Sequence, residues 1–144
     1  MSAAIVVQDV SRAAGVPAAA SLRNWARAAL KRERGELTIR VVGARESRKL
    51  NARYRGKDKP TNVLSFPYHE PGALGDLVLC APVVAREARE QGKPPRHHWA
   101  HLVIHGTLHL LGYDHIKNRD AQRMEARERA ILARLGIADP YLEP

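Results

Sequence analysis

The segment HGTLHLLGYDH, from His105 to His115, carries three histidines at a spacing that suits one metal ion. On a helix, His105 and His109 project from the same face one turn apart. Gly112 falls where this helix would end, because glycine adopts the left-handed conformation of a helix terminus without strain. The turn that follows can return His115 to the same ion. Three imidazoles and a vacant fourth position form the ligand set of a catalytic zinc.

The spacing HxxxHxxGxxH repeats that of the metzincin proteases, HExxHxxGxxH, in which the glycine turn delivers the third histidine. Gly106 stands where those proteases have the glutamate that serves as general base. The sequence therefore predicts a zincin-like metal site without peptidase chemistry. His101 is separated from His109 by about 12 Å along a helix axis and cannot share its ion. Whether His101 supports a ligand, faces the substrate or is structural stays open.

A strongly basic region precedes these histidines. The net charge is +9, and residues 23–59 contain thirteen Lys and Arg against four Asp and Glu, whereas the two signs balance in the rest of the chain. Such a region can simply be a solvated face, but a concentrated positive field also suits a phosphate backbone. Arg55, within this region, has the side chain best shaped to hold a phosphate by two parallel hydrogen bonds. The alternative interpretation is that Arg55 is simply one more charge on a basic surface.

The length of 144 residues fits a single domain, residues 1–144, and the seven aromatic residues indicate a mainly aliphatic core. No apolar run approaches the roughly 20 residues of a membrane span, and the N-terminus does not resemble a signal peptide. The single cysteine, Cys80, cannot form an internal disulfide. These features favour a cytoplasmic protein.

The apolar pattern predicts strands near residues 5–7, 37–41, 63–66 and 77–80, and helices near residues 18–33, 45–53, 82–91, 96–111 and 118–135. The unbroken apolar run at 77–80 is typical of a central strand. Asp76, just before it, is either a turn residue or a carboxylate that orients a ligand histidine. This order of elements predicts an α+β fold, in which a small mixed four-stranded sheet packs with about five helices. The zincin-like metal site then lies on a helix and the following turn.

The segments HGTLHLLGYDH, LNARYRGKDKPTNVLSFP and GDLVLC together resemble the bacterial YbeY family of metal-dependent endoribonucleases. The family pattern HGxLHLxGYDH is met at every fixed position, and the arginine of YRGKDKPTNVLSFP is Arg55. The resemblance implies a zinc held by His105, His109 and His115, and a functional role for Arg55. It also implies a cytoplasmic enzyme that matures ribosomal RNA, notably the 3′ end of the small-subunit RNA, and acts in ribosome quality control with ribosome-associated proteins.

The residues add a mechanistic hypothesis to this resemblance. A metal would polarise a phosphoryl oxygen or activate water, and Arg55 would stabilise the charge that develops in the transition state. Either a metal-activated water or the RNA 2′-hydroxyl can be the nucleophile, and Asp114 can assist the reaction or orient an imidazole. Other divalent transition metals also suit imidazole ligands. Two alternatives remain: a metalloprotease-like hydrolase, and a non-catalytic RNA-binding ribosome-assembly factor with a structural metal.

Overall fold

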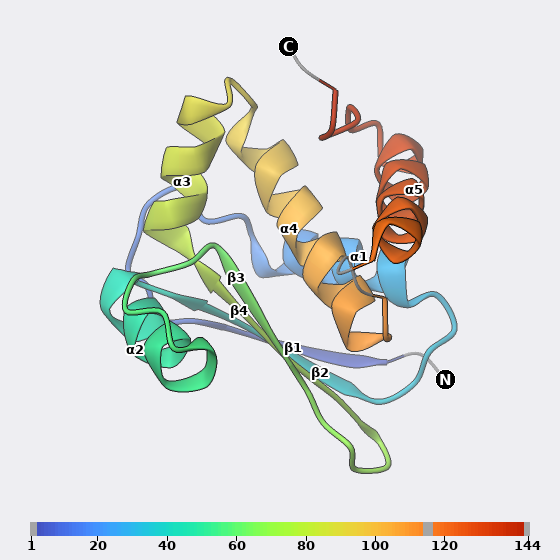
Figure 1. The fold of residues 1–144 in the computed structure, drawn as a ribbon, viewed down its shortest axis with the longest axis horizontal. Coiled ribbons are helices and arrows are strands. Elements are labelled where there is room, and N and C mark those ends of the chain that lie inside the picture. The colour runs from blue at the N-terminus through green and yellow to red at the C-terminus, as the bar shows by residue number, and fades with distance from the viewer. Residues whose placement is uncertain (1–2, 114–116, 143–144) are drawn as a thin grey trace.

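The computed structural model describes residues 3–113 and 117–142. The described strands are β1 (Ala4–Asp9), β2 (Glu36–Val42), β3 (Val63–Pro67) and β4 (Ala73–Cys80), and the described helices are α1 (Ala19–Leu30), α2 (Ala44–Arg55), α3 (Ala81–Glu90), α4 (Pro95–Leu110) and α5 (Asn118–Arg134). Figure 1 shows that α1, α4 and α5 lie on one side of the sheet and α2 on the other. The predicted α+β class, with a mixed four-stranded sheet and five helices, is confirmed.

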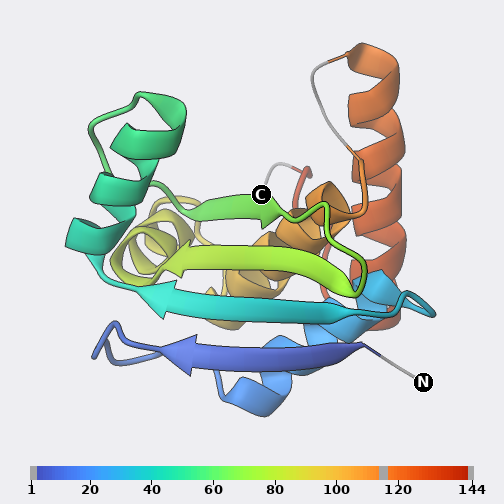
Figure 2. The same ribbon diagram turned by 90° about the horizontal axis from the view of Figure 1, so that it is seen from below.

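The sheet has the strand order β1-β2-β4-β3 (Figure 2). Strands β1, β2 and β4 run parallel, whereas β3 pairs antiparallel with β4 and forms one edge. The run from Leu77 to Cys80 is fully or almost fully buried and lies in β4, between two neighbours, as its unbroken apolar character predicts. Strand β3 is less buried and carries polar Ser65, in keeping with an edge position.

The main core lies between the sheet and helices α1 and α4. Leu37, Ile39, Leu77 and Leu79 alternate along β2 and β4 toward these helices and are completely buried. A smaller apolar cluster lies on the opposite face, which we call the outer face, where Val42, Leu64, Val78, Cys80 and Val83 pack with Leu50 of α2. Because α2 covers only one end of this outer face, the fold leaves part of the sheet open to solvent (Figure 2).

Helix α4 ends in the turn that its glycine predicts. Gly112 has a φ of 98°, in the left-handed region. The amide of Gly112 donates to the carbonyl of His109 at 3.0 Å, and the amide of Tyr113 donates to the carbonyl of Leu108 at 3.1 Å. These bonds reverse the chain just after His109. In the described part of the chain, no helix has both the length and the apolar character needed to cross a membrane.

Two buried polar residues of α2 hold the loop that leads to β3. Ser47 Oγ donates to the carbonyl of Thr61 at 3.1 Å and accepts from the Thr61 amide at 3.0 Å. Asn51 Nδ2 donates to the carbonyl of Lys59 at 2.8 Å. Both side chains are almost fully buried, so these bonds form without competition from water. They tie the loop before β3 to α2, the helix that ends at Arg55.

Candidate metal centre

The histidines of α4 form a ladder along one face of the helix. Rings of His101 and His105 have centroids 6.0 Å apart, and rings of His105 and His109 have centroids 4.9 Å apart. All three are partly buried. They line a cleft of about 310 Å³ whose walls come from α2, the loop before β3, β3 itself, α4 and the C-terminal segment. The lining residues are Arg55, Thr61, Asn62, Val63, Ser65, His101, Leu102, His105, His109 and Tyr141.

A buried carboxylate from α5 faces this ladder. Glu128 is fully buried (0% exposed), and its carboxylate is hydrogen-bonded to His105 Nδ1 and to the hydroxyl of Tyr141. His101 Nε2 lies 3.3 Å from the same carboxylate. Burial alone would raise the pKa of Glu128, but the hydrogen bonds from His101, His105 and Tyr141, with the charge interaction of His105, lower it to about 2. Glu128 is therefore ionised at neutral pH.

The ionised carboxylate determines where the neighbouring protons lie. A carboxylate ion only accepts hydrogen bonds, so His105 Nδ1, His101 Nε2 and the Tyr141 hydroxyl must each donate. With its Nδ1 proton directed at Glu128, His105 would bind a metal through Nε2. This arrangement, a carboxylate behind a histidine, is the one that holds ligand imidazoles in metal enzymes.

Two ligand sets overlap at His105. Ligand atoms of His101, His105 and Glu128 all lie within 4.8 Å of one another, which makes this group a candidate metal site. The predicted set shares His105 and adds His109, whose ring is next along the ladder. Its third member, His115, and also Asp114, lie outside the described residues. The three imidazoles of the predicted set fit zinc and related divalent transition metals, and so do the two imidazoles and one carboxylate of the other set.

The second predicted site residue, Arg55, is the last residue of α2 and is exposed to solvent. Gly56 follows it in the left-handed conformation, with a φ of 69°, and ends the helix. The structure brings Arg55 to the cleft that His105 and His109 also line. Two segments that lie about fifty residues apart in the chain therefore meet at one cavity. A phosphate in this cleft could contact both the guanidinium and a metal held by the histidines.

The position that holds glutamate in the metzincins faces the sheet in this chain. A Cβ atom on Gly106 would lie 2.8 Å from Leu77 Cδ2, 3.2 Å from Ser65 Oγ and 3.2 Å from Val63 Cγ2. Ser65 Oγ also donates to the carbonyl of Gly106 at 3.2 Å. Helix α4 thus packs so closely on β3 and β4 that a side chain at position 106 would require its neighbours to move. Because α4 contains no Asp or Glu elsewhere, the helix supplies no carboxylate for peptidase chemistry.

Gly106→Ala should therefore destabilise the protein. Overpacking a tight contact costs about 1–3 kcal/mol, and the better helix propensity of alanine returns at most about 1 kcal/mol. Urea unfolding measures the difference in the free energy of unfolding. In a Leu77→Val background, which shortens the side chain in the closest contact, the cost of Gly106→Ala should shrink. An equal cost in both backgrounds would contradict this steric explanation.

Two other polar residues, His98 and Asp76, form hydrogen bonds outside the histidine ladder. His98 is buried and bonds Glu87 through Nε2 at 2.9 Å, and Asn62 Nδ2 donates to the same carboxylate at 3.0 Å. Burial lowers the pKa of His98, against the opposing effect of Glu87, which favours a neutral imidazole. Asp76 accepts a hydrogen bond from the Tyr68 hydroxyl. Asp76 therefore serves the loop after β3, and no described contact joins it to the histidines.

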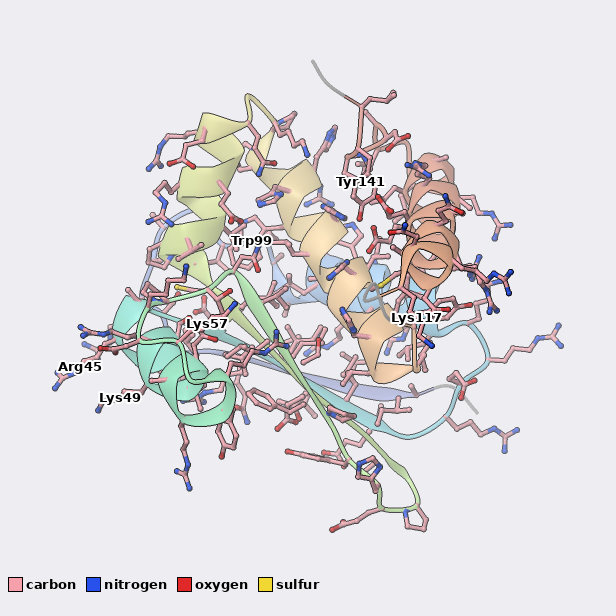
Figure 3. The ribbon with its side chains drawn as sticks, in the orientation of Figure 1. Arg45, Lys49, Lys57, Trp99, Lys117 and Tyr141 are labelled. Carbon is pink, nitrogen blue, oxygen red and sulfur yellow. The ribbon has the colours of Figure 1, made fainter. Side chains whose placement is uncertain are left out.

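Sequence reasoning did not identify Glu128 or Tyr141 as part of the site. A signal for Glu128 was present, because Met124, Glu128, Ile131 and Leu132 recur at helical spacing and are all buried. A charged residue within an apolar stripe must have a partner. Tyr141 carries no such periodic signal. It lies in the segment after α5, and its contact with Glu128 depends on how that segment folds back toward α4 (Figure 3).

Comparison with known proteins places this geometry in a family. The model of the family described as endoribonuclease YbeY matches residues 9–136. Proteins described as endoribonuclease YbeY include one from Methylococcus capsulatus, 55% identical over 144 residues with 96% of this chain and 95% of that protein covered. Another, from Alkalilimnicola ehrlichii, is 58% identical over 139 residues, with 89% and 84% covered. The solution structure of TM1509 from Thermotoga maritima has the same fold, with a TM-score of 0.59, 24% identity, and 95% of this chain and 99% of that chain covered. The match over most of the chain shows that it belongs to the endoribonuclease YbeY family.

Proposed function

We propose that this chain is a metal-dependent endoribonuclease that cuts single-stranded RNA. The observation that carries the proposal is that Arg55 and the histidine ladder of α4 line one cleft, on a chain with a net charge of +9. A cleft that combines a guanidinium with a metal site suits a phosphodiester. Similarity to proteins described as endoribonuclease YbeY supports RNA as the substrate.

The proposed metal is one zinc ion per chain, held by His105, His109 and His115. A bound zinc would supply Lewis-acid activation of a phosphoryl oxygen or of water. Glu128 would keep the proton of His105 on Nδ1 and direct Nε2 to the metal, and the Tyr141 hydroxyl would hold the carboxylate in place. Arg55 would bind a non-bridging phosphate oxygen and stabilise the negative charge that builds up during cleavage.

The proposed biological setting follows the family resemblance. The substrate would be ribosomal RNA, with the 3′ end of the small-subunit RNA as the cleavage region, and the enzyme would act in the cytoplasm in ribosome maturation and quality control. Phosphate contacts position an RNA strand without reading its bases. Ribosome-associated partner proteins would therefore direct the cut, and residues 1–144 would act as one catalytic domain.

The function is tested by stripping the protein of metal, reloading it with zinc and offering single-stranded RNA, duplex RNA and single-stranded DNA. The reloaded protein should cut single-stranded RNA, the stripped protein should not, and elemental analysis should give about one zinc per active chain. A single 2′-deoxy substitution at the cut position then separates the two nucleophiles, because it removes the 2′-hydroxyl and leaves water able to attack.

Three results would contradict the proposal. Full activity with far less than one metal ion per chain would show that the reaction does not need the metal. RNA binding without any cleavage would favour the non-catalytic assembly factor. Release of peptides from a protein substrate, lost on chelation, would favour the protease, against which the glycine at position 106 and its tight packing on the sheet argue.

A further inference from the structure

Three aromatic side chains gather on the outer face of the sheet, and the site described above uses none of them. Tyr54 comes from the last turn of α2, Phe66 from β3 and Tyr68 from the residue just after β3. Tyr54 is 56% exposed and Tyr68 49% exposed, whereas both tryptophans of the chain are buried. We call Tyr54, Phe66 and Tyr68 the outer aromatic surface. A cluster of exposed large apolar groups indicates a binding surface.

The contacts of these rings place them on one face and hold them there. Phe66 packs on the small outer-face cluster, and its centroid lies 5.1 Å from that of Tyr54 at an interplanar angle of 67°. Asp76 is the register partner of Phe66 in β4, so the two side chains share a face. Tyr68 reaches that face because its hydroxyl bonds Asp76. The rings are therefore positioned before any ligand arrives.

The outer aromatic surface lies directly across β3 from the cleft. Successive residues of a strand point to opposite faces. Ser65 points toward α4, where it bonds the carbonyl of Gly106 and lines the cleft, while Phe66 points the other way. Tyr54 immediately precedes Arg55 at the end of α2. Since β3 is an edge strand, a flexible chain that leaves the cleft can pass over this edge and reach the aromatic rings.

The cation beside Tyr54, and the position of Tyr54 next to Arg55, favour a nucleic acid over a protein as the occupant of this surface. The guanidinium of Arg53 lies 5.4 Å from the centroid of Tyr54. Tyr68 lies at the other end of the surface, where its hydroxyl donates to the carboxylate of Asp76. An aromatic ring beside an arginine, close to a cleft that suits a phosphate, is typical of a surface for single-stranded nucleic acid, where rings stack on bases and cations contact phosphates.

We propose that the outer aromatic surface stacks on bases of the RNA strand that flanks the cut. This inference rests on the proposed endoribonuclease function and extends the substrate contact beyond the cleft. Binding would be tolerant of sequence, because every base offers an aromatic face. The enzyme would then prefer single-stranded substrates, since the bases of a duplex are already stacked on one another and cannot reach the rings.

The test compares Tyr54→Leu and Tyr68→Leu with Tyr54→Phe, which keeps a ring. Binding of a single-stranded RNA oligonucleotide to metal-free protein is followed by fluorescence anisotropy. Each leucine variant should bind about 5- to 100-fold more weakly, the loss expected for one stacked base, and Tyr54→Phe should bind like the wild type. The salt dependence of binding should keep its slope, because no charge is removed. Val6→Ala, on the exposed side of the other edge strand β1, is the matched control and should bind normally.

An oligonucleotide with abasic positions completes the test. Removing bases should weaken wild-type binding to the level of the leucine variants and should change the binding of those variants little. Wild-type affinity in both leucine variants, with wild-type protein still cutting RNA, would overturn the stacking surface and leave the endoribonuclease proposal intact. Failure of the wild-type protein to bind or cut RNA would overturn both proposals. Because both tyrosines are about half exposed, the variants should retain the fold, which thermal unfolding checks.

Discussion

Replacing Arg55 with alanine is expected to slow RNA cleavage by on the order of 10²- to 10³-fold, the cost of removing one group that stabilises transition-state charge. Arg55 is exposed and ends α2, so its truncation removes no core contact and the fold and metal content should not change. RNA affinity should fall far less than the rate, because many other cations attract the strand. Single-turnover cleavage at saturating protein concentration separates the rate from the affinity.

The matched control is Arg45→Ala. Arg45 is an exposed arginine on the first turn of the same helix and points away from the rest of the molecule (Figure 3). Its loss changes the net charge equally, yet the cleavage rate should stay within a few-fold of wild type. Arg55→Lys should recover only part of the lost rate, since lysine restores the charge but not the two parallel hydrogen bonds of arginine. An equal decrease in Arg45→Ala and Arg55→Ala would reduce the role of Arg55 to general attraction.

Local signals predicted the elements that carry the site. Helical spacing of His105 and His109, with a glycine that ends the helix, predicted both α4 and the turn at Gly112, which has the expected positive φ. The unbroken apolar run before α3 predicted the central position of β4. These features depend on residues within a few positions of one another, and for that reason one sequence is enough to predict them.

Contacts between distant elements were not predicted. Glu128 lies twenty-three residues after His105 and on another helix, so their contact depends on how α5 packs against α4. The tight approach of Gly106 to β3 and β4 likewise depends on tertiary packing. From the sequence, Gly106 was noted only because it replaces the glutamate of the proteases. The structure adds that a side chain at this position would require its neighbours on β3 and β4 to move. The structure also places the basic end of α2 at the cleft, which charge counting could not do.

Replacing Glu128 with glutamine is expected to weaken zinc binding about 10- to 100-fold, the usual cost of losing a partner that supports a metal-ligand histidine. Glutamine has nearly the shape of glutamate and can still accept the His105 Nδ1 proton, so the buried site stays filled. It lacks the negative charge that makes the imidazole a stronger donor to the metal. Competition with a chelating dye measures the affinity directly. Glu90→Gln removes an exposed carboxylate from α3, where Glu90 pairs with Arg86, and it should bind zinc normally.

The same assay decides whether Glu128 supports a ligand or is one itself. In the candidate group of His101, His105 and Glu128, the nitrogens that face the carboxylate carry protons, and zinc could bind there only by displacing them. If zinc instead binds His105 Nε2 with His109 and His115, His109→Ala should weaken binding more than Glu128→Gln, and His101→Ala should weaken it least. The reverse order, with His109→Ala binding like wild type, would make Glu128 a ligand. His101 cannot join the set of His105, His109 and His115, because its distance from His109 along the helix, about 12 Å, exceeds the reach of two zinc–nitrogen bonds.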